Sequence, residues 1–127
     1  GDSLIPAVMR SYETDRAANE AAAAERRKEV YKAVPRISEI EEESRKISME
    51  ISKKMLSKGS SAGIKELKNR FDNLMNEKSY LLTDNNFKID YMEIQYTCPL
   101  CKDLGILDSG ARCSCFARKL SSFGKKV

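Results

Sequence analysis

Four cysteines lie within eighteen residues near the end of this chain, and the chain contains no others. They form a CxxC pair and a CxC pair separated by eleven residues, at Cys98, Cys101, Cys113 and Cys115. Thiolates are good ligands for zinc, and a CxxC pair lets two of them bind one ion from a single tight turn. The spacing therefore predicts one Zn²⁺ held by all four cysteines.

A zinc ion that is held by four protein ligands has no free position for water or substrate, so a structural role is expected rather than a catalytic one. Cations close in sequence, at Lys102, Arg112, Arg118 and Lys119, would offset the negative charge of four thiolates. Three other uses of the cysteines remain open at this point: two disulfides, a redox dithiol and an iron–sulfur cluster.

The amino-acid composition limits the size of the hydrophobic core. The chain has 127 residues, of which 33% are charged and 41% hydrophobic, with no Trp and no His. This balance is typical of exposed helices with a narrow apolar seam, and it leaves no room for a large core. No apolar run approaches membrane-spanning length and no secretory signal is visible. A cytoplasmic protein with no membrane partner is therefore expected.

Hydrophobic spacing predicts three helices. Nothing breaks a helix from Leu4 to about Lys32, and Pro35 must end or kink it. Two later stretches repeat apolar residues at three- and four-residue steps: Ile37, Ile40, Ser44, Ile47, Ile51 and Met55, then Ile64, Leu67, Phe71, Leu74 and Leu81. We predict helices over about 4–33, 37–58 and 61–83, the last two paired as an antiparallel hairpin. The same seam could instead pair two copies of the chain.

The expected fold is mainly α: a long helix, an antiparallel helical hairpin and a small four-cysteine zinc-binding module with short strands. We place the helical region at 1–86 and the zinc-binding module at 87–118, with a basic tail at 119–127. Strands are expected on either side of the CxxC turn, with Gly105 and the turn at Gly110 returning the chain to the second cysteine pair.

The first predicted helix carries an apolar face near its start. Leu4, Ile5, Val8 and Tyr12 recur at helical spacing. This face either packs on the rest of the chain or docks in a groove on another protein. We take these four residues as the hypothetical partner-binding surface.

The end of the chain is basic. From residue 116 onward it carries Arg118, Lys119, Lys125 and Lys126 and no acid, which equals the whole net charge of +4. Lys and Arg gain affinity for phosphates by releasing counterions, so these four residues are candidate nucleic-acid contacts. A solvated end, or a linker into a further domain, is the simpler explanation of these four residues.

Several strings together carry a resemblance to a known family. They are YTCPLCKDLG at 96–105, RCSC at 112–115, ERRKEVY at 25–31 and VPRI at 34–37. In these strings the chain resembles the amino-terminal region of bacterial and phage replicative helicase loaders of the DnaC/DnaI type. The resemblance implies a domain that binds the hexameric replicative DNA helicase, so that the helicase can be loaded at origins or restart sites during DNA replication.

In that family a following AAA+ ATPase domain binds ATP and single-stranded DNA. No GxxxxGK[ST] loop occurs in this chain, so no nucleotide is expected here, and the basic tail would be the start of the linker to that domain. No enzymatic activity is expected either, because there is no His and the cysteines are assigned to metal. The alternative is a free-standing zinc-ribbon adaptor that binds nucleic acid through its basic end.

Overall fold

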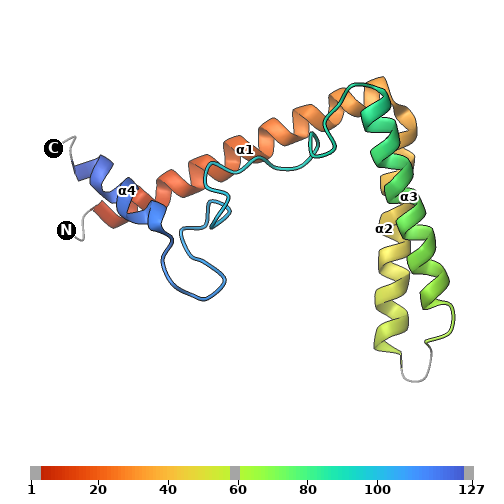
Figure 1. The fold of residues 1–127 in the computed structure, drawn as a ribbon. Helices are drawn as coiled ribbons and strands as arrows, with labels where there is room; N and C mark the ends of the chain where they lie inside the picture. The colour runs from red at the N-terminus through yellow and green to blue at the C-terminus, as the bar shows by residue number, and fades with distance from the viewer. Residues whose placement is uncertain (1–3, 58–60, 125–127) are drawn as a thin grey trace. The chain divides into compact units, whose positions relative to one another are not determined.

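The computed structural model describes residues 4–57 and 61–124 (Figure 1). Helices dominate this part of the chain: α1 (Ile5–Ala33), α2 (Pro35–Leu56), α3 (Ile64–Asp84) and α4 (Ser114–Gly124). The prediction of a mainly helical fold is confirmed. None of the helices in the described ranges is long and apolar enough to cross a membrane.

The short strands expected around the cysteines are absent from the described residues. Ile106 and Arg112 form one isolated antiparallel bridge, and no sheet develops from it. The reason lies in the backbone, which has positive φ angles at Lys102, Asp103 and Gly105. Left-handed residues turn the chain sharply, and a strand needs extended backbone. The segment between the two cysteine pairs is therefore a series of turns.

The chain divides into two compact units, and the division differs from the expected one. The first unit combines 1–25 with 93–127, and the second comprises 26–92. The expected boundary near residue 86 assigned all of the first helix to the helical region. In the structure, the first half of α1 packs against the cysteine segment instead. This contact joins residues far apart in sequence, which local spacing does not reveal.

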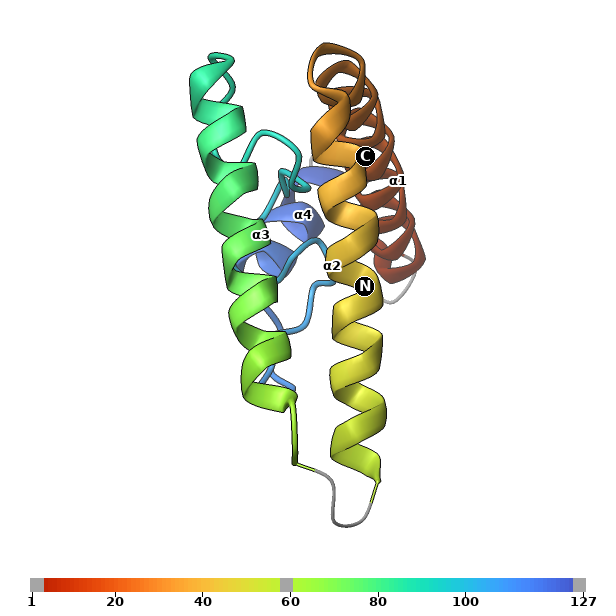
Figure 2. The ribbon, with the colours of Figure 1, turned by 90° about the vertical axis from the view of Figure 1, so that its right-hand side faces the viewer.

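The second unit is built on the hairpin of α2 and α3, which run side by side (Figure 2). Pro35 occupies the first turn of α2, where its missing N–H is tolerated because first-turn N–H groups have no partner within the helix. The Val34 N–H donates to the Val30 carbonyl at 2.7 Å, and the Ile37 N–H donates to the Val34 carbonyl at 3.0 Å. The interruption between α1 and α2 is therefore a single residue, and α2 begins slightly earlier than expected.

The hairpin seam contains most of the predicted residues, but Met55 is 67% exposed and lies outside it. Ile40, Ile47, Leu67 and Leu74 form its buried cluster. The one polar position of the seam, Ser44, is also buried, and its hydroxyl donates to the Glu41 carbonyl at 3.0 Å. A buried hydroxyl with a partner costs little, so Ser44 is tolerated in the seam. The expected pairing of α2 with α3 is found.

Two further contacts stabilise the hairpin unit. Val30, Val34, Ile37, Leu82 and Met92 form a second buried cluster, in which the end of α1 packs against the end of α3. On the surface, Arg36 donates to both carboxylate oxygens of Glu77, at 2.8 and 3.0 Å. This two-pronged geometry fits the planar guanidinium to the carboxylate, and it lowers the pKa of Glu77.

Candidate metal centre

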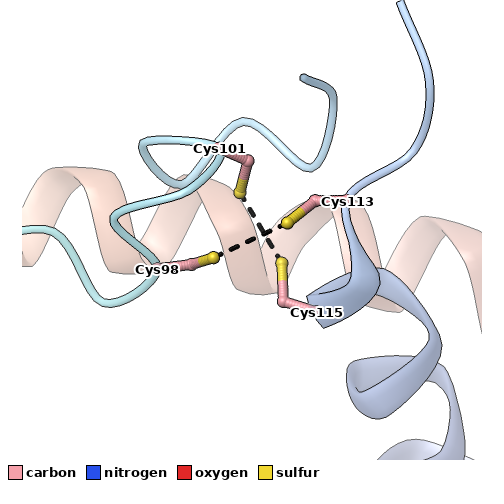
Figure 3. Close-up of side chains that lie close together, drawn as sticks. All are labelled: Cys98, Cys101, Cys113 and Cys115. Atoms are coloured by element: carbon pink, nitrogen blue, oxygen red, sulfur yellow. Dashed lines mark hydrogen bonds between the residues drawn. The ribbon is translucent and has the colours of Figure 1, made fainter.

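The four cysteines converge on one point in the first unit (Figure 3). Their Sγ atoms all lie within 4.8 Å of one another. The Cys98 and Cys113 sulfurs are 3.7 Å apart, and the Cys101 and Cys115 sulfurs are 3.6 Å apart. All four residues are buried, with exposed fractions between 2% and 9%. The sequence-predicted ligand set is thus brought together, by residues from two separate turns of the chain.

The spacing of the sulfurs fits a single metal ion. Zn–S bonds of about 2.3 Å in a tetrahedron put the sulfurs about 3.8 Å apart, whereas the sulfurs of a disulfide are bonded at about 2.05 Å. The Cys98–Cys113 and Cys101–Cys115 separations match the edges of such a tetrahedron, and none of the four cysteines forms a disulfide. Four buried thiols so placed can bind a metal ion such as zinc.

The first cysteine pair is held in a tight turn by a buried carboxylate. Asp103 is fully buried, and its carboxylate accepts the Cys98 N–H at 2.7 Å and the Thr97 N–H at 3.1 Å. The Leu104 N–H donates to the Cys101 carbonyl at 3.1 Å, which closes the turn. Charge-assisted bonds of this kind are stronger than neutral ones. Asp103 therefore fixes the backbone from which Cys98 and Cys101 project.

The second pair stands at the start of α4. The Cys113 N–H donates to the Gly105 carbonyl at 2.9 Å, and this bond joins the two cysteine turns. Helix α4 begins at Ser114, so Cys115 lies in its first turn. The N-terminal end of a helix favours negative charge, and thiolates are stabilised there. The start of α4 therefore suits a pair of metal-binding thiolates.

Helix α1 supplies side chains to the same site. The Tyr12 hydroxyl lies 2.8 Å from Sγ of Cys115. Arg16 donates to the Asp103 carbonyl at 2.6 Å, and Asn19 donates to the Asp103 carboxylate at 2.8 Å. Sequence reasoning did not find Arg16, Asn19 or Asp103 as site residues. Helical spacing could have indicated Arg16 and Asn19, because residues 12, 16 and 19 share one face of a helix.

The hypothesis of a partner surface at Leu4, Ile5, Val8 and Tyr12 requires correction. Val8 and Tyr12 have no exposed surface, and they form one buried cluster with Phe116 and the four cysteines. Ile5 packs against this cluster, and Leu4 is half-buried. Burial on the cysteine segment removes Val8 and Tyr12 from contact with a partner, and it leaves Leu4 and Ile5 only partly exposed. The apolar face of α1 follows the other interpretation, in which it packs on its own chain.

One cation of the basic end, Lys119, is also bonded within the chain. Lys119 donates to the Asp15 carboxylate at 2.8 Å and to the Ser11 hydroxyl at 2.7 Å. Arg118 is exposed, whereas Lys125 and Lys126 lie outside the described residues. Helix α4 continues to Gly124, so residues 119–124 are helical and do not form the expected tail.

The thiols differ in acidity before a metal binds. Hydrogen bonding by the Cys101 backbone lowers the pKa of Cys98 to about 7. Burial raises the pKa of Cys115 to about 12 despite its position in the first turn of α4. Burial, followed by the hydrogen bond with Cys115, also raises the pKa of Tyr12, which keeps its hydroxyl proton. A metal ion must therefore displace a proton from Cys115, and cysteine binds metal as the thiolate.

Comparison of the chain with protein-family models, with curated proteins and with solved structures gave no match. The fold and the site define a helical protein with a four-cysteine centre that is suited to a metal ion.

Proposed function

We propose that this chain is a zinc-stabilised docking domain of a replicative helicase loader of the DnaC/DnaI type. In this role it binds the hexameric DNA helicase in the cytoplasm, so that the helicase can be placed on DNA at origins or restart sites. The observation that carries the proposal is the closed set of four buried thiols, formed by the same cysteine spacing that carries the resemblance.

The proposed zinc ion acts on the fold. Cys98, Cys101, Cys113 and Cys115 would hold it, and they fill the four positions of a tetrahedral site. The ion then joins the turn before Asp103 to the start of α4, which hydrophobic burial alone would connect weakly in so small a unit. We propose no enzymatic step in this chain, and the ATPase activity of a loader would belong to its AAA+ domain.

The exposed apolar residues of α2 are the surface that we propose for the helicase. Met49 is 55% exposed and Leu56 is 87% exposed. These residues are seven positions apart, so they lie two turns apart on one face of the helix. Exposed apolar residues that gather on one face can form an interaction site, and the flexible Met side chain adapts to partner surfaces. The surface of Met49 and Leu56 replaces the buried face of α1 as the candidate docking surface.

Size-exclusion chromatography of the zinc-loaded chain with the replicative helicase hexamer from the same source tests this proposal. We expect the chain to elute with the hexamer at physiological salt. The double variant Met49→Glu and Leu56→Glu should lose co-elution. Tyr80→Glu is the matched control, because Tyr80 is 67% exposed on α3 and lies outside the proposed surface. Failure of the zinc-loaded wild type to co-elute would overturn the helicase proposal.

The nucleic-acid adaptor is the second candidate, and the excess of cations near the end of the chain favours it. The Lys119–Asp15 ion pair weakens it, because that cation is already neutralised within the chain. Binding to labelled DNA that falls steeply with salt and is reduced by Arg118→Glu would support this function. Truncation is not a suitable test, since Phe116 belongs to the buried cysteine cluster.

A further inference from the structure

One face of α1 contacts both halves of the metal centre. Tyr12 reaches the sulfur of Cys115, which belongs to the second cysteine pair. Arg16, one turn later, binds the carbonyl of Asp103, and Asn19, two turns later, binds its carboxylate. Asp103 in turn holds the N–H of Cys98, in the first pair. The first half of α1 is therefore bonded to each of the two turns that carry the ligands.

The packing of Tyr12 on this segment is very close. Gly105 has a φ of +80°, and a Cβ atom at this position would lie 2.8 Å from Cε2 of Tyr12. Real Cβ atoms do not approach other atoms so closely. The Gly105 carbonyl also accepts the Cys113 N–H, so the Tyr12 ring lies against the residue that joins the two cysteine turns. A side chain at Gly105 would displace the ring and its hydroxyl from Cys115.

We infer that Tyr12, Arg16 and Asn19 are positioning residues of the metal centre, so that metal binding and docking of the first half of α1 are thermodynamically linked. The inference rests on the metal proposed above and does not depend on the helicase. A metal-bound Cys115 is a thiolate with no proton, so the 2.8 Å contact requires the Tyr12 hydroxyl to donate to it.

Linkage gives this inference two consequences. Hydrogen bonds to ligand atoms orient the ligands and tune the metal, and their loss typically weakens metal binding about 10- to 100-fold. Coupling between two equilibria is reciprocal, so a helix that tightens metal binding is held in place by the metal to the same degree. Tyr12, Arg16 and Asn19 should therefore affect zinc affinity, and zinc should affect the order of α1.

Zinc affinity, measured by competition with a chromogenic chelator, tests the first consequence. Tyr12→Phe removes only the hydroxyl, and we expect it to bind zinc about 10-fold more weakly. Tyr80→Phe is the matched control, because the Tyr80 side chain is exposed on α3. Gly105→Ala should weaken binding as well. Gly110→Ala controls for backbone strain, since Gly110 also has a positive φ, of +89°, but open space around its Cβ position.

Cobalt substitution provides a readout that a purely structural role would not change. Loss of a hydrogen bond raises the energy of the sulfur electrons, so the thiolate-to-cobalt charge-transfer band of Tyr12→Phe should move to longer wavelength. The band of Tyr80→Phe should stay where it is in the wild type.

Hydrogen exchange tests the reciprocal consequence. Removal of zinc by a chelator should speed amide exchange in residues 5–25 of α1 by about 10-fold or more, while exchange in α3 changes little. Wild-type affinity in both Tyr12→Phe and Gly105→Ala, or unchanged exchange in α1, would overturn the linkage alone. A wild-type chain that takes up no zinc would overturn the metal assignment as well, so the two failures are distinguishable.

Discussion

The hydroxyl oxygen of Tyr12 lies 2.8 Å from Sγ of Cys115, although 103 positions separate the two residues in sequence. The contact joins the first turns of α1 to the first turn of α4, at the metal centre. It explains why the apolar start of α1 is not free for a partner, since Val8 and Tyr12 on that face are buried in one cluster with the four cysteines. The four-cysteine segment and the first half of α1 are therefore one folding unit.

Loss of one ligand should unfold the first unit and spare the hairpin. Cys98→Ser leaves three thiolates, and zinc-binding energy is folding energy in small metal-binding domains. We expect a zinc content close to zero and loss of dispersed NMR signals from residues 97–124. The signals of α2 and α3 should remain, because their buried cluster contains no cysteine.

Ser121→Ala, an exposed change on α4, serves as the control for Cys98→Ser. A Cys98→Ser chain that retains one tightly bound zinc would show that Cys98 is not a ligand.

Asp103→Asn should weaken the metal centre without touching a ligand. The substitution puts an amide where a carboxylate accepts the N–H groups of Cys98 and Thr97 and the side-chain amide of Asn19, so at least one of these donors loses its acceptor. We expect about 10-fold weaker zinc binding and a loss of about 1–3 kcal/mol in the free energy of unfolding. Chelator competition and thermal unfolding measure these effects.

Asp108→Asn is the matched control, because Asp108 is exposed in the turn between the cysteine pairs. Equal behaviour of the Asp103 and Asp108 variants would show that the buried carboxylate does not organise the site.

Zinc affinity should rise with pH. The pKa of Cys115 is raised to about 12 in the metal-free chain, so its thiol is protonated throughout the neutral range. Zinc binds the thiolate and releases this proton, and protons therefore compete with the metal. Competition titrations at pH 6.5 and pH 8 should show tighter binding at the higher pH, with proton release detectable by calorimetry in buffers of different ionisation enthalpy. Affinity that is independent of pH would contradict thiolate ligation.

A substitution in the core of the hairpin should leave the metal centre unaffected. Ile47 is 3% exposed in the seam, and Ile47→Ala should lower the free energy of unfolding of the hairpin by about 2–5 kcal/mol. Met49→Ala, at a position 55% exposed on the same helix, should change it by less than about 0.5 kcal/mol. Zinc affinity should stay at the wild-type value in both variants. A fall in zinc affinity with Ile47→Ala would contradict the division into two compact units.

The parts of the fold that depend on local sequence patterns could be predicted. The alternating steps from Ile40 to Ile47 and from Leu67 to Leu74 indicated the hairpin, because helical periodicity places these residues on one face of each helix. The CxxC and CxC spacing indicated the four ligands for the same reason, since each pair comes from one short turn.

The contacts between α1 and the cysteine segment could not be predicted from local spacing. Nothing in the local sequence marks Asp103, because the side chain that binds its carboxylate from α1, Asn19, is 84 positions away in sequence. The apolar face at Val8 and Tyr12 was recognisable, but periodicity says only that a face is covered and not what covers it. The expected strands failed because left-handed residues such as Lys102 and Asp103 turn the backbone.

Native mass spectrometry of the purified chain, without added metal, tests the central claim most directly. A chain that uses its four cysteines as one structural site should carry a single zinc ion, and mild acid should release the ion together with the fixed structure of the first unit. We predict one zinc per chain and no disulfide. A chain that carries no metal, or whose mass shows two disulfides, would contradict the account.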